Sequence, residues 1–406
     1  MKNNLLIAQS GGPTSAINAT LSGILKLASI SDKVDNIYGA KNGIKGVLNE
    51  KLIELNELKK NINNLNKLSF TPGAALGSCR YKLKNINNSH NDYKKIIDVF
   101  TKYDISYFIY IGGNDSMDTV MKLNQYCKKN NINTIKIIGA PKTIDNDLKE
   151  IDHTPGFGSA AKYIATTFAE LERDISVYES NSVTIVEVMG RNAGWLTAAS
   201  ALSRINGNNG PSLIYLCENV FDENKFIKDV KEKLKTKKSI IIAISEGLKT
   251  KDEKYLSFKN ETNKISDVFG HVYVAGAGKY LEQLVEKEIG CKVRSIELNL
   301  MQRCSMHIAS ATDIKESSMI GMKAIQMALE GNTGQMASLK RVNDNDYKVE
   351  YTSVPIEKVA NKERKVPREW ITENYIKDDL LNYLFPLIQG EIDITYNKGI
   401  PSQFIF

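Results

Sequence analysis

The densest group of chemically capable side chains in this 406-residue chain is the segment PKTIDND at residues 141–147. Two carboxylates, Asp145 and Asp147, stand two positions apart, and Lys142 precedes the first of them by three. One carboxylate can act as a general base while the other orients a metal ion or a substrate. The two would share a side only if the backbone there is extended. The alternative interpretation is an Asx-type turn with a surface ion pair.

Glycine-containing segments follow two other apolar runs. The sequence SGG begins at Ser10, directly after residues 5–8, and GGNDS begins at Gly112, after residues 108–111. Glycines at such turns let backbone N–H groups point at an anion, with a helix N-terminus behind them. A bare strand-to-helix turn and a simple helix cap remain the alternatives. Neither segment is a Walker A motif or G-x-G-x-x-G, so a nucleotide is not implied.

Arginine and glutamate recur after the later apolar runs. The segment EVMGRNAG occupies residues 187–194, SEG occupies residues 245–247, and Arg294 and Arg303 bracket a further stretch. Because the fork of a guanidinium group matches two phosphate oxygens, this arrangement suits a sugar phosphate. Each arginine taken alone is more typical of the protein surface.

The elements that must position these residues are short apolar runs alternating with helical patterns. A helix after the first run carries Ile17, Leu21, Ile24 and Leu25 on one face. Such alternation predicts parallel sheets covered by helices on both faces, the doubly wound α/β class, with ligands at the carboxyl ends of the strands. The predicted strands contain residues 5–8, 108–111, 135–138, 183–186, 213–216 and 240–244.

Three stretches depart from this alternation. Residues 51–67 are rich in Asn and Lys with a loose leucine pattern, which indicates an exposed helix or an insertion. Residues 343–346, NDND, predict the turn of a hairpin. Residues 357–368 are strongly charged, and we interpret them as solvated surface.

His153 and His307 have no partner at metal-ligand spacing, and we interpret both as structural.

Composition excludes several classes of protein. Hydrophobic residues make up 42% and charged residues 25%, as in an ordinary folded chain of two to three domains. The net charge of +7 comes without a basic, aromatic-interleaved stripe, so we predict no nucleic-acid partner. The five cysteines form no C-x-x-C pair, which indicates a reducing cytoplasm. No apolar stretch approaches the roughly 20 residues of a membrane span.

At these positions the chain resembles the phosphofructokinase family. The matching segments, in the family's order, are SGGPTSAIN, LGSCR, GGNDS, PKTIDND, GFGSA, EVMGRNAG, SEG and QR, and they cover about the first three-quarters of the chain. The resemblance implies two Rossmann-like, doubly wound domains with mainly parallel sheets and an active site in the cleft between them. Residues 1–156 would form the domain that binds the phosphoryl donor, and part of residues 303–370 would return to this domain. Residues 157–302 would bind the sugar phosphate and receive the C-terminal tail.

The resemblance also implies phosphoryl transfer to the 1-hydroxyl of fructose 6-phosphate, with Mg²⁺ as the metal and Asp145 as the base. The implied donor contacts are Gly11, Gly12, Arg80, Asp115, Ser116 and Lys142. The implied sugar contacts are Thr143, Asp145, Asp147, Met189, Gly190, Arg191, Glu246, Arg294 and Arg303. The implied metal-facing residues are Asn114 and Asp147, although the family often has aspartate where this chain has Asn114. Asparagine is the weaker magnesium ligand.

Two positions decide the donor. ATP-using bacterial members typically have glycine at the positions of Asp115 and Lys142, whereas pyrophosphate-using members have Asp and Lys. A carboxylate at Asp115 would crowd and repel the α-phosphate of ATP, and Lys142 would neutralise charge on the transferring oxygens. We therefore expect a reversible pyrophosphate-dependent enzyme, with an ATP-dependent 6-phosphofructokinase as the alternative.

Other departures from the family bear on regulation and assembly. Arginines of the bacterial effector site correspond to Ser22 and Lys26, so nucleotide control is not supported. Arg294 resembles a sugar-phosphate contact supplied across a subunit interface, which predicts a homodimer or homotetramer. A non-catalytic regulatory subunit would be expected to lose Asp145 or Lys142, and both are present.

Overall fold

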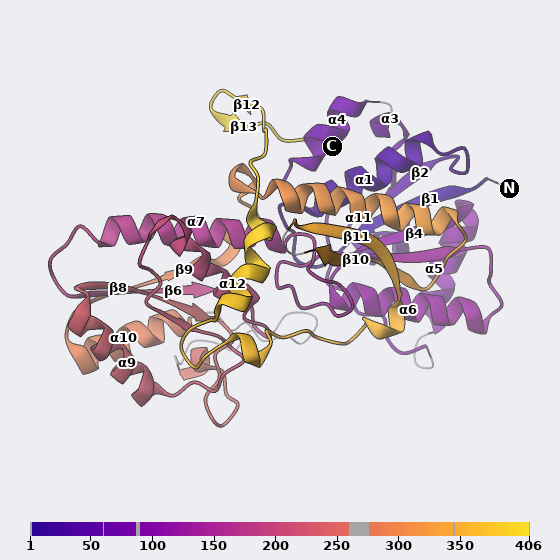
Figure 1. The fold of residues 1–406 in the computed structure, drawn as a ribbon. Helices are drawn as coiled ribbons and strands as arrows, with labels where there is room; N and C mark the ends of the chain where they lie inside the picture. The colour runs from indigo at the N-terminus through magenta and orange to yellow at the C-terminus, as the bar shows by residue number, and fades with distance from the viewer. Residues whose placement is uncertain (1, 60, 87–89, 260–275, 344–345, 406) are drawn as a thin grey trace.

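The computed structural model describes residues 2–59, 61–86, 90–259, 276–343 and 346–405. Two α/β units lie side by side, and each is built on its own sheet with helices packed against it (Figure 1). Most strand pairs in both sheets are parallel, so the predicted fold class is confirmed.

The larger sheet contains seven strands in the order β11-β10-β5-β4-β1-β2-β3. All neighbours in it are parallel except β2 with β3 and β10 with β11, which form its two edges. Every residue of β1 is buried, because helices cover both faces of the sheet, and this explains its unbroken apolar run. The strands are β1 (Asn4–Gln9), β2 (Ile37–Ala40), β3 (Leu52–Glu54), β4 (Ile105–Gly112), β5 (Lys136–Pro141), β10 (Gln335–Asn343) and β11 (Lys348–Pro355).

Two of the helices that cover this sheet, α1 and α11, are packed unusually closely (Figure 1). A Cβ on Gly23 would lie 2.0 Å from the Ser318 carbonyl oxygen, and a Cβ on Gly321 would lie 2.1 Å from the Thr20 carbonyl oxygen. Only glycine allows two helix backbones to approach this far. The helices of the unit are α1 (Ile17–Ile30), α2 (Gly43–Leu48), α3 (Asn56–Lys59), α4 (Ile62–Ser69), α5 (His90–Lys102), α6 (Asn114–Lys129) and α11 (Ala311–Leu329).

The smaller sheet contains four parallel strands in the order β7-β8-β6-β9. Its outer strand β9 has exposed positions that include Lys292 and Arg294. The strands are β6 (Ser182–Val188), β7 (Leu213–Tyr215), β8 (Ser239–Ser245) and β9 (Lys292–Glu297). The helices are α7 (Phe157–Ile175), α8 (Trp195–Ala199), α9 (Glu223–Thr236) and α10 (Ala277–Ile289).

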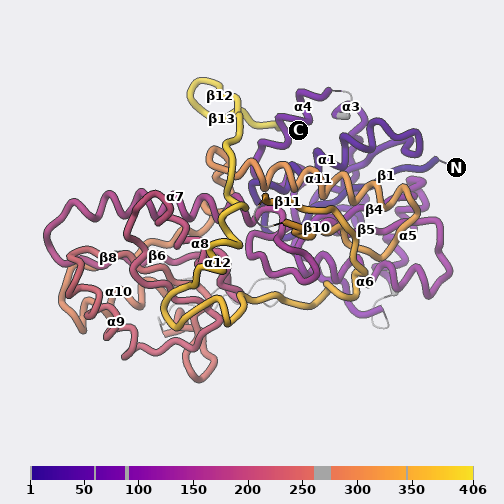
Figure 2. Tube along the Cα trace, in the orientation of Figure 1, coloured from indigo at the N-terminus to yellow at the C-terminus, as the bar shows by residue number. Residues whose placement is uncertain are grey.

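The C-terminal part of the chain contacts both units. After β11 it passes to the second unit, where α12 (Asp378–Leu384) packs against α8 (Figure 2). Trp195, Trp370 and Tyr383 form an aromatic cluster there, with ring centroids 5.3 to 6.4 Å apart. A short hairpin of β12 (Tyr396–Asn397) and β13 (Ile400–Pro401) follows.

All six strands predicted from apolar runs are present, as β1, β4, β5, β6, β7 and β8. The hairpin predicted at residues 343–346 is confirmed by the antiparallel pairing of β10 and β11, although residues 344 and 345 lie outside the described part of the chain. The prediction of an exposed helix or an insertion at residues 51–67 was correct in part. The described residues contain two short helices with exposed outer positions, but also the edge strand β3. Leu65 and Leu68 are buried because they share the inner face of α4.

A buried ionic network lies beside the connection between the two units. His153 Nδ1 is 2.8 Å from Asp152 Oδ1, and His153 Nε2 is 2.6 Å from Glu316 Oε2. Tyr347 donates a hydrogen bond to Glu316 Oε1 at 2.8 Å. Burial lowers the pKa of His153, but Glu316 and Asp152 outweigh burial and raise it to about 9. The imidazole is therefore a structural cation at neutral pH.

We expect this network to make the free energy of unfolding depend on pH. An unfolded histidine has a pKa of about 6.5, so the stabilisation is complete below that pH and is lost as the pH rises to the folded value of about 9. The loss should be roughly 3 kcal/mol. Denaturant unfolding at several pH values would measure it, with His153→Gln as the control. The same slope in both proteins would contradict this assignment.

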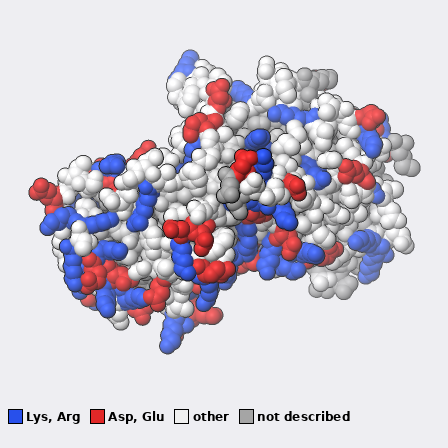
Figure 3. All heavy atoms as spheres, in the orientation of Figure 1, with Lys and Arg blue, Asp and Glu red and all other residues white. Residues whose placement is uncertain are grey.

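The face drawn in Figure 3 carries basic and acidic side chains interspersed, without a continuous basic stripe. Within the described parts of the chain, no helix has the length and apolar character to cross a bilayer.

Candidate active site

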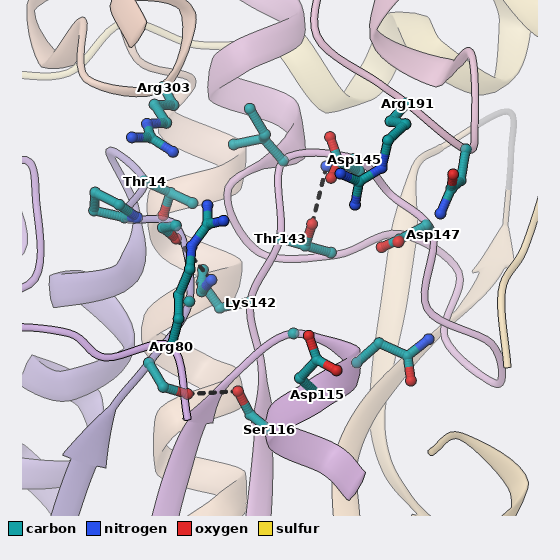
Figure 4. A pocket seen from close by; sticks show the side chains of 18 of the residues that line it. Thr14, Arg80, Asp115, Ser116, Lys142, Thr143, Asp145, Asp147, Arg191 and Arg303 are labelled. Carbon is teal, nitrogen blue, oxygen red and sulfur yellow. Dashed lines mark hydrogen bonds between the residues drawn. The ribbon is translucent and has the colours of Figure 1, made fainter. Parts of the chain in front are cut away.

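The carboxyl ends of strands from both sheets border one cavity of about 580 Å³ (Figure 4). Its walls come from the ends of β1, β4 and β5 in the first unit and of β6 and β8 in the second. The strand-end segments picked out in the sequence therefore meet at one place, as in other open α/β sheets. The predicted residues that line it are Gly11, Gly12, Arg80, Asn114, Asp115, Ser116, Lys142, Thr143, Asp145, Asp147, Met189, Arg191, Glu246 and Arg303.

The loop after β1 brings two cations close to its backbone. Gly11 has a φ of +76°, in the left-handed region that favours glycine. A Cβ on Gly11 would lie 3.1 Å from Lys142 Nζ, and a Cβ on Gly12 would lie 2.9 Å from an Arg303 guanidinium nitrogen. Lys142 Nζ also donates a hydrogen bond to the Gly12 carbonyl oxygen at 2.7 Å. Side chains at these two positions would force Lys142 and Arg303 to shift from their present places.

The loop after β4 leads directly into α6, whose first turn faces the cavity. Gly113 is the N-cap of this helix, and Asp115 and Ser116 lie in its first turn. A helix N-terminus favours an anionic ligand. Asp115 adds a carboxylate to this otherwise anion-binding corner, and Lys82 Nζ lies 3.7 Å from its Oδ1.

A buried asparagine shapes the loop that carries the two aspartates. Asn146 has a φ of +54°, a left-handed conformation that asparagine adopts more readily than most residues. Its Oδ1 accepts a hydrogen bond from the Thr154 N–H at 3.0 Å, and its Nδ2 donates to Tyr383 Oη at 3.0 Å. The backbone is therefore not extended, yet Asp145 and Asp147 both line the cavity.

Burial makes the acids of the cavity weaker. It raises the pKa of Asp145, although the charge of Arg191 opposes the shift. Burial, together with Asp145 and Glu363, raises the pKa of Asp147 to about 7. Burial and Asp145 raise the pKa of Glu246 to about 8. A carboxyl group with a raised pKa is a better proton acceptor, which suits it to general-base work.

Lys142 is a buried cation between the glycine loop and the aspartate loop. Burial lowers its pKa to about 8, and the nearby charge of Asp145 opposes the shift. The ammonium group is therefore mostly protonated at neutral pH. Figure 4 shows the Arg80 side chain extending beside it, so two positive charges face the same side of the cavity.

In the second unit, the carboxylate of Glu246 is held by a backbone N–H group. Gly190 donates its N–H to Glu246 Oε1 at 3.2 Å and accepts a hydrogen bond from Ser245 Oγ at 2.6 Å. Gly190 itself is not part of the cavity lining, whereas its neighbours Met189 and Arg191 are. Arg191 points toward Asp145 (Figure 4).

Arg294 lies away from the cavity of its own chain. It is an exposed residue of β9, in register with Thr184 of β6. It borders a separate small pocket together with Tyr178 and Ser182. The sugar-phosphate contact predicted for Arg294 is therefore not made within one chain.

Residues 361–366, which we call the crossing segment, reach the cavity from the C-terminal part of the chain. Asn114 Oδ1 accepts a hydrogen bond from the Asn361 N–H at 2.6 Å, and Asn114 Nδ2 donates to the Lys362 carbonyl oxygen at 2.9 Å. Glu363 lines the cavity and accepts a hydrogen bond from Asn192 Nδ2 at 2.7 Å. The crossing segment thus contacts both units at the cavity.

This segment corrects one interpretation made from the sequence and provides the partners of Asn114. Residues 357–368 are not all solvated surface, because Asn361 and Glu363 line the cavity. Asn114 lines the cavity, and both the oxygen and the nitrogen of its side-chain amide are hydrogen-bonded to the crossing segment. A run of charged residues has the same pattern whether it faces water or a polar cavity, so no sequence signal distinguished Glu363.

Comparison with known proteins agrees with this geometry. The family model described as Phosphofructokinase matches residues 4–328, and the chain therefore belongs to that family. It is 37% identical over 406 residues to pyrophosphate–fructose 6-phosphate 1-phosphotransferase of Halomonas elongata, covering 99% of this chain and 95% of the relative.

Solved structures show the same relationship. The pyrophosphate-dependent phosphofructokinase from Nitrosospira multiformis superposes with a TM-score of 0.88 at 34% identity, covering 98% of this chain and 95% of that chain. The pyrophosphate-dependent phosphofructokinase from Marinobacter aquaeolei superposes with a TM-score of 0.87 at 35% identity, covering 100% and 96%.

Proposed function

We propose that this chain transfers a phosphoryl group reversibly from pyrophosphate to the 1-hydroxyl of fructose 6-phosphate, giving fructose 1,6-bisphosphate and phosphate in glycolysis and gluconeogenesis. The observation that carries the proposal is one cavity that combines Asp115 and Lys142 on its donor side with the buried acid Asp145. A relative that matches the chain over nearly its whole length is named for this reaction.

The first unit binds the donor. The Gly11 loop, Arg80 and the N-terminus of α6 with Ser116 offer positive charge and hydrogen-bond donors to pyrophosphate. The carboxylate of Asp115 would crowd and repel the α-phosphate of ATP, so it opposes ATP by bulk and by like charge. Lys142 neutralises the charge that builds on the bridging and transferred oxygens in the transition state.

The aspartate loop and the second unit bind the sugar. Asp145 accepts the proton of the 1-hydroxyl as that oxygen attacks phosphorus. Thr143 Oγ1 accepts a hydrogen bond from the Asp145 N–H at 3.1 Å, which steadies the loop (Figure 4). The further sugar contacts that we propose are Thr143, Asp147, Met189, Arg191, Glu246 and Arg303. Gly190, which the sequence also indicated, would act through the hydrogen bond that it donates to Glu246.

Mg²⁺ fits the acidic side of this cavity, which is the side that Asp145 and Asp147 line. The ion prefers oxygen ligands and is usually held by one or two carboxylates, substrate phosphates and water. Among the residues that the structure describes, no three His, Cys, Asp or Glu side chains are placed to hold a metal ion together. Asp147 would therefore hold the ion jointly with pyrophosphate. The bound ion would neutralise charge on the phosphate oxygens.

The donor assignment predicts that the unmodified protein uses pyrophosphate with Mg²⁺ and has little activity with ATP. Asp115→Gly should raise kcat/KM for ATP about 10-fold or more, the effect of removing a repulsion of about 1.4 kcal/mol. A coupled assay for fructose 1,6-bisphosphate with both donors side by side measures this. Efficient use of ATP by the unmodified protein, or no gain after the substitution, would favour the alternative ATP-dependent 6-phosphofructokinase.

We further infer a homodimer or homotetramer in which Arg294 of one copy contacts the sugar phosphate bound by its neighbour. Its exposure on an outer strand, away from its own cavity, supports this. Light scattering should give a dimer or tetramer mass, and Arg294→Ala should raise the KM for fructose 6-phosphate about 10-fold. Lys292→Ala, on the same strand, is the control. A fully active monomer would disprove the arrangement.

For location we propose the cytoplasm. All five cysteines are free thiols, as is usual in a reducing compartment. The partners that we propose are fructose 6-phosphate, pyrophosphate and further copies of this chain.

A further inference from the structure

The crossing segment has no role in the proposed function as stated so far, although it forms part of the cavity wall. Its attachment to the first unit uses two side chains one helical turn apart on α6. Asn114 binds the backbone of residues 361 and 362, and Asp118 Oδ1 accepts a hydrogen bond from Asn361 Nδ2 at 2.8 Å. Positions four apart on a helix lie on the same face, so the start of α6 acts as one docking surface for the segment.

Beyond these contacts, the segment runs against the aspartate loop. Glu363 forms an isolated antiparallel bridge with Leu148, and the Arg364 N–H donates to the Asp147 carbonyl oxygen at 2.7 Å. The Arg364 guanidinium group donates to the Asn146 carbonyl oxygen at 3.1 Å. The backbone of Glu363 is therefore fixed next to Asp147.

The side chain of Glu363 is fixed from the second unit. Asn192 Nδ2 donates to its Oε1 at 2.7 Å, and the carboxylate faces the cavity that Asp145 and Asp147 also line. A carboxylate held in this way brings negative charge to the side of the cavity where we place the metal.

We infer that Glu363 supplies, through a bound water, the second carboxylate for the Mg²⁺ held by Asp147, and that Asn114 is the positioning residue that brings it there. This inference rests on the proposed function, because it takes the acidic side of the cavity as the metal site. A water-mediated contact agrees with the hydration that Mg²⁺ normally keeps and with the lack of three converging ligand side chains among the described residues.

Two isosteric substitutions separate this role from a purely structural one. Glu363→Gln keeps an oxygen that can accept the hydrogen bond from Asn192, so it removes the charge and little else. Asn114→Asp keeps the acceptor for the Asn361 N–H but loses the donor to Lys362, and it sets two oxygens against each other at a 2.9 Å contact.

The experiment is Mn²⁺ binding followed by electron paramagnetic resonance, with and without the inert donor analogue methylenediphosphonate. Glu363→Gln should raise the dissociation constant for Mn²⁺ about 10-fold, the usual scale for losing an outer contact of a metal site. Asn114→Asp and Asn114→Ala should weaken binding in the same direction. Glu357→Gln, an exposed carboxylate on the same returning part of the chain, should leave binding unchanged.

Opposite results would overturn the inference. If Asn114 faced the ion directly, Asn114→Asp would tighten Mn²⁺ binding, and unchanged binding after Glu363→Gln would exclude the carboxylate. Because Asn114 acts through Glu363, combining an Asn114 substitution with Glu363→Gln should weaken Mn²⁺ binding no further than the more damaging of the two substitutions does alone. Additive losses would contradict this. Mn²⁺ binding needs no turnover, so a protein that is inactive with pyrophosphate but shows this pattern would disprove the donor assignment alone.

Discussion

Asp145→Asn should lower kcat by about 10²- to 10⁴-fold, the range typical of losing a general base, while the KM for fructose 6-phosphate changes little. Asparagine keeps the shape of the side chain, and its backbone N–H can still donate to Thr143 Oγ1. Its side-chain amide, however, cannot take the proton of the attacking hydroxyl. Steady-state kinetics with both substrates saturating measures the effect.

The pH dependence provides the control for this substitution. Burial raises the pKa of Asp145, so the unmodified enzyme should lose activity as the pH falls and this carboxyl becomes protonated. The residual activity of Asp145→Asn should lack that acidic limb. Turnover close to that of the unmodified enzyme would show that another group is the base.

Lys142→Met should lower kcat with pyrophosphate by about 10²- to 10³-fold, as expected when a group that stabilises transition-state charge is removed. Methionine retains the length and apolar stem of the buried side chain, so the loss would report the missing charge. Because burial lowers the pKa of Lys142 to about 8, activity should fall as the pH rises through that value in the unmodified enzyme, and the variant should lack this limb.

The effect of Lys142→Met should differ in kind from that of Asp115→Gly. The first removes a cation that acts during the reaction, and the loss should therefore appear in turnover. The second removes an obstacle to one donor, and the gain should appear in kcat/KM for ATP. Unchanged turnover with pyrophosphate after Lys142→Met would remove this lysine from the mechanism.

The sequence predicted the strands with unbroken apolar runs, including the edge strand β7, but it missed the strands β2, β3 and β9. Strands such as β1 and β8 are covered on both faces, so nearly every residue is apolar and the run is easily recognised. The outer strands β3 and β9 have the sequences LIE and KVRSIE, without an unbroken apolar run. Their strand conformation depends on pairing with β2 and β6, which a local pattern does not record.

The site shows the same division between local and distant information. Apart from Arg80, its donor and base residues lie in segments directly after β1, β4 and β5, so the carboxyl-end rule for parallel sheets predicted that they would meet. Glu363 reaches the cavity from a different part of the chain, and its position depends on contacts with Asn114, Asp147 and Asn192. The turn at Asn146 likewise depends on Thr154 and Tyr383.

The order of strands in the larger sheet also affects how the protein emerges from the ribosome. β5 ends at Pro141, but its neighbour β10 begins only at Gln335. At about 5 to 20 residues per second, translation takes roughly 10 to 40 s to deliver that neighbour. Meanwhile all four strands of the smaller sheet, complete at Glu297, have been synthesised and can pair. The nascent first unit therefore waits with an unpaired strand edge, and it is the part of the growing chain most exposed to aggregation and to chaperones.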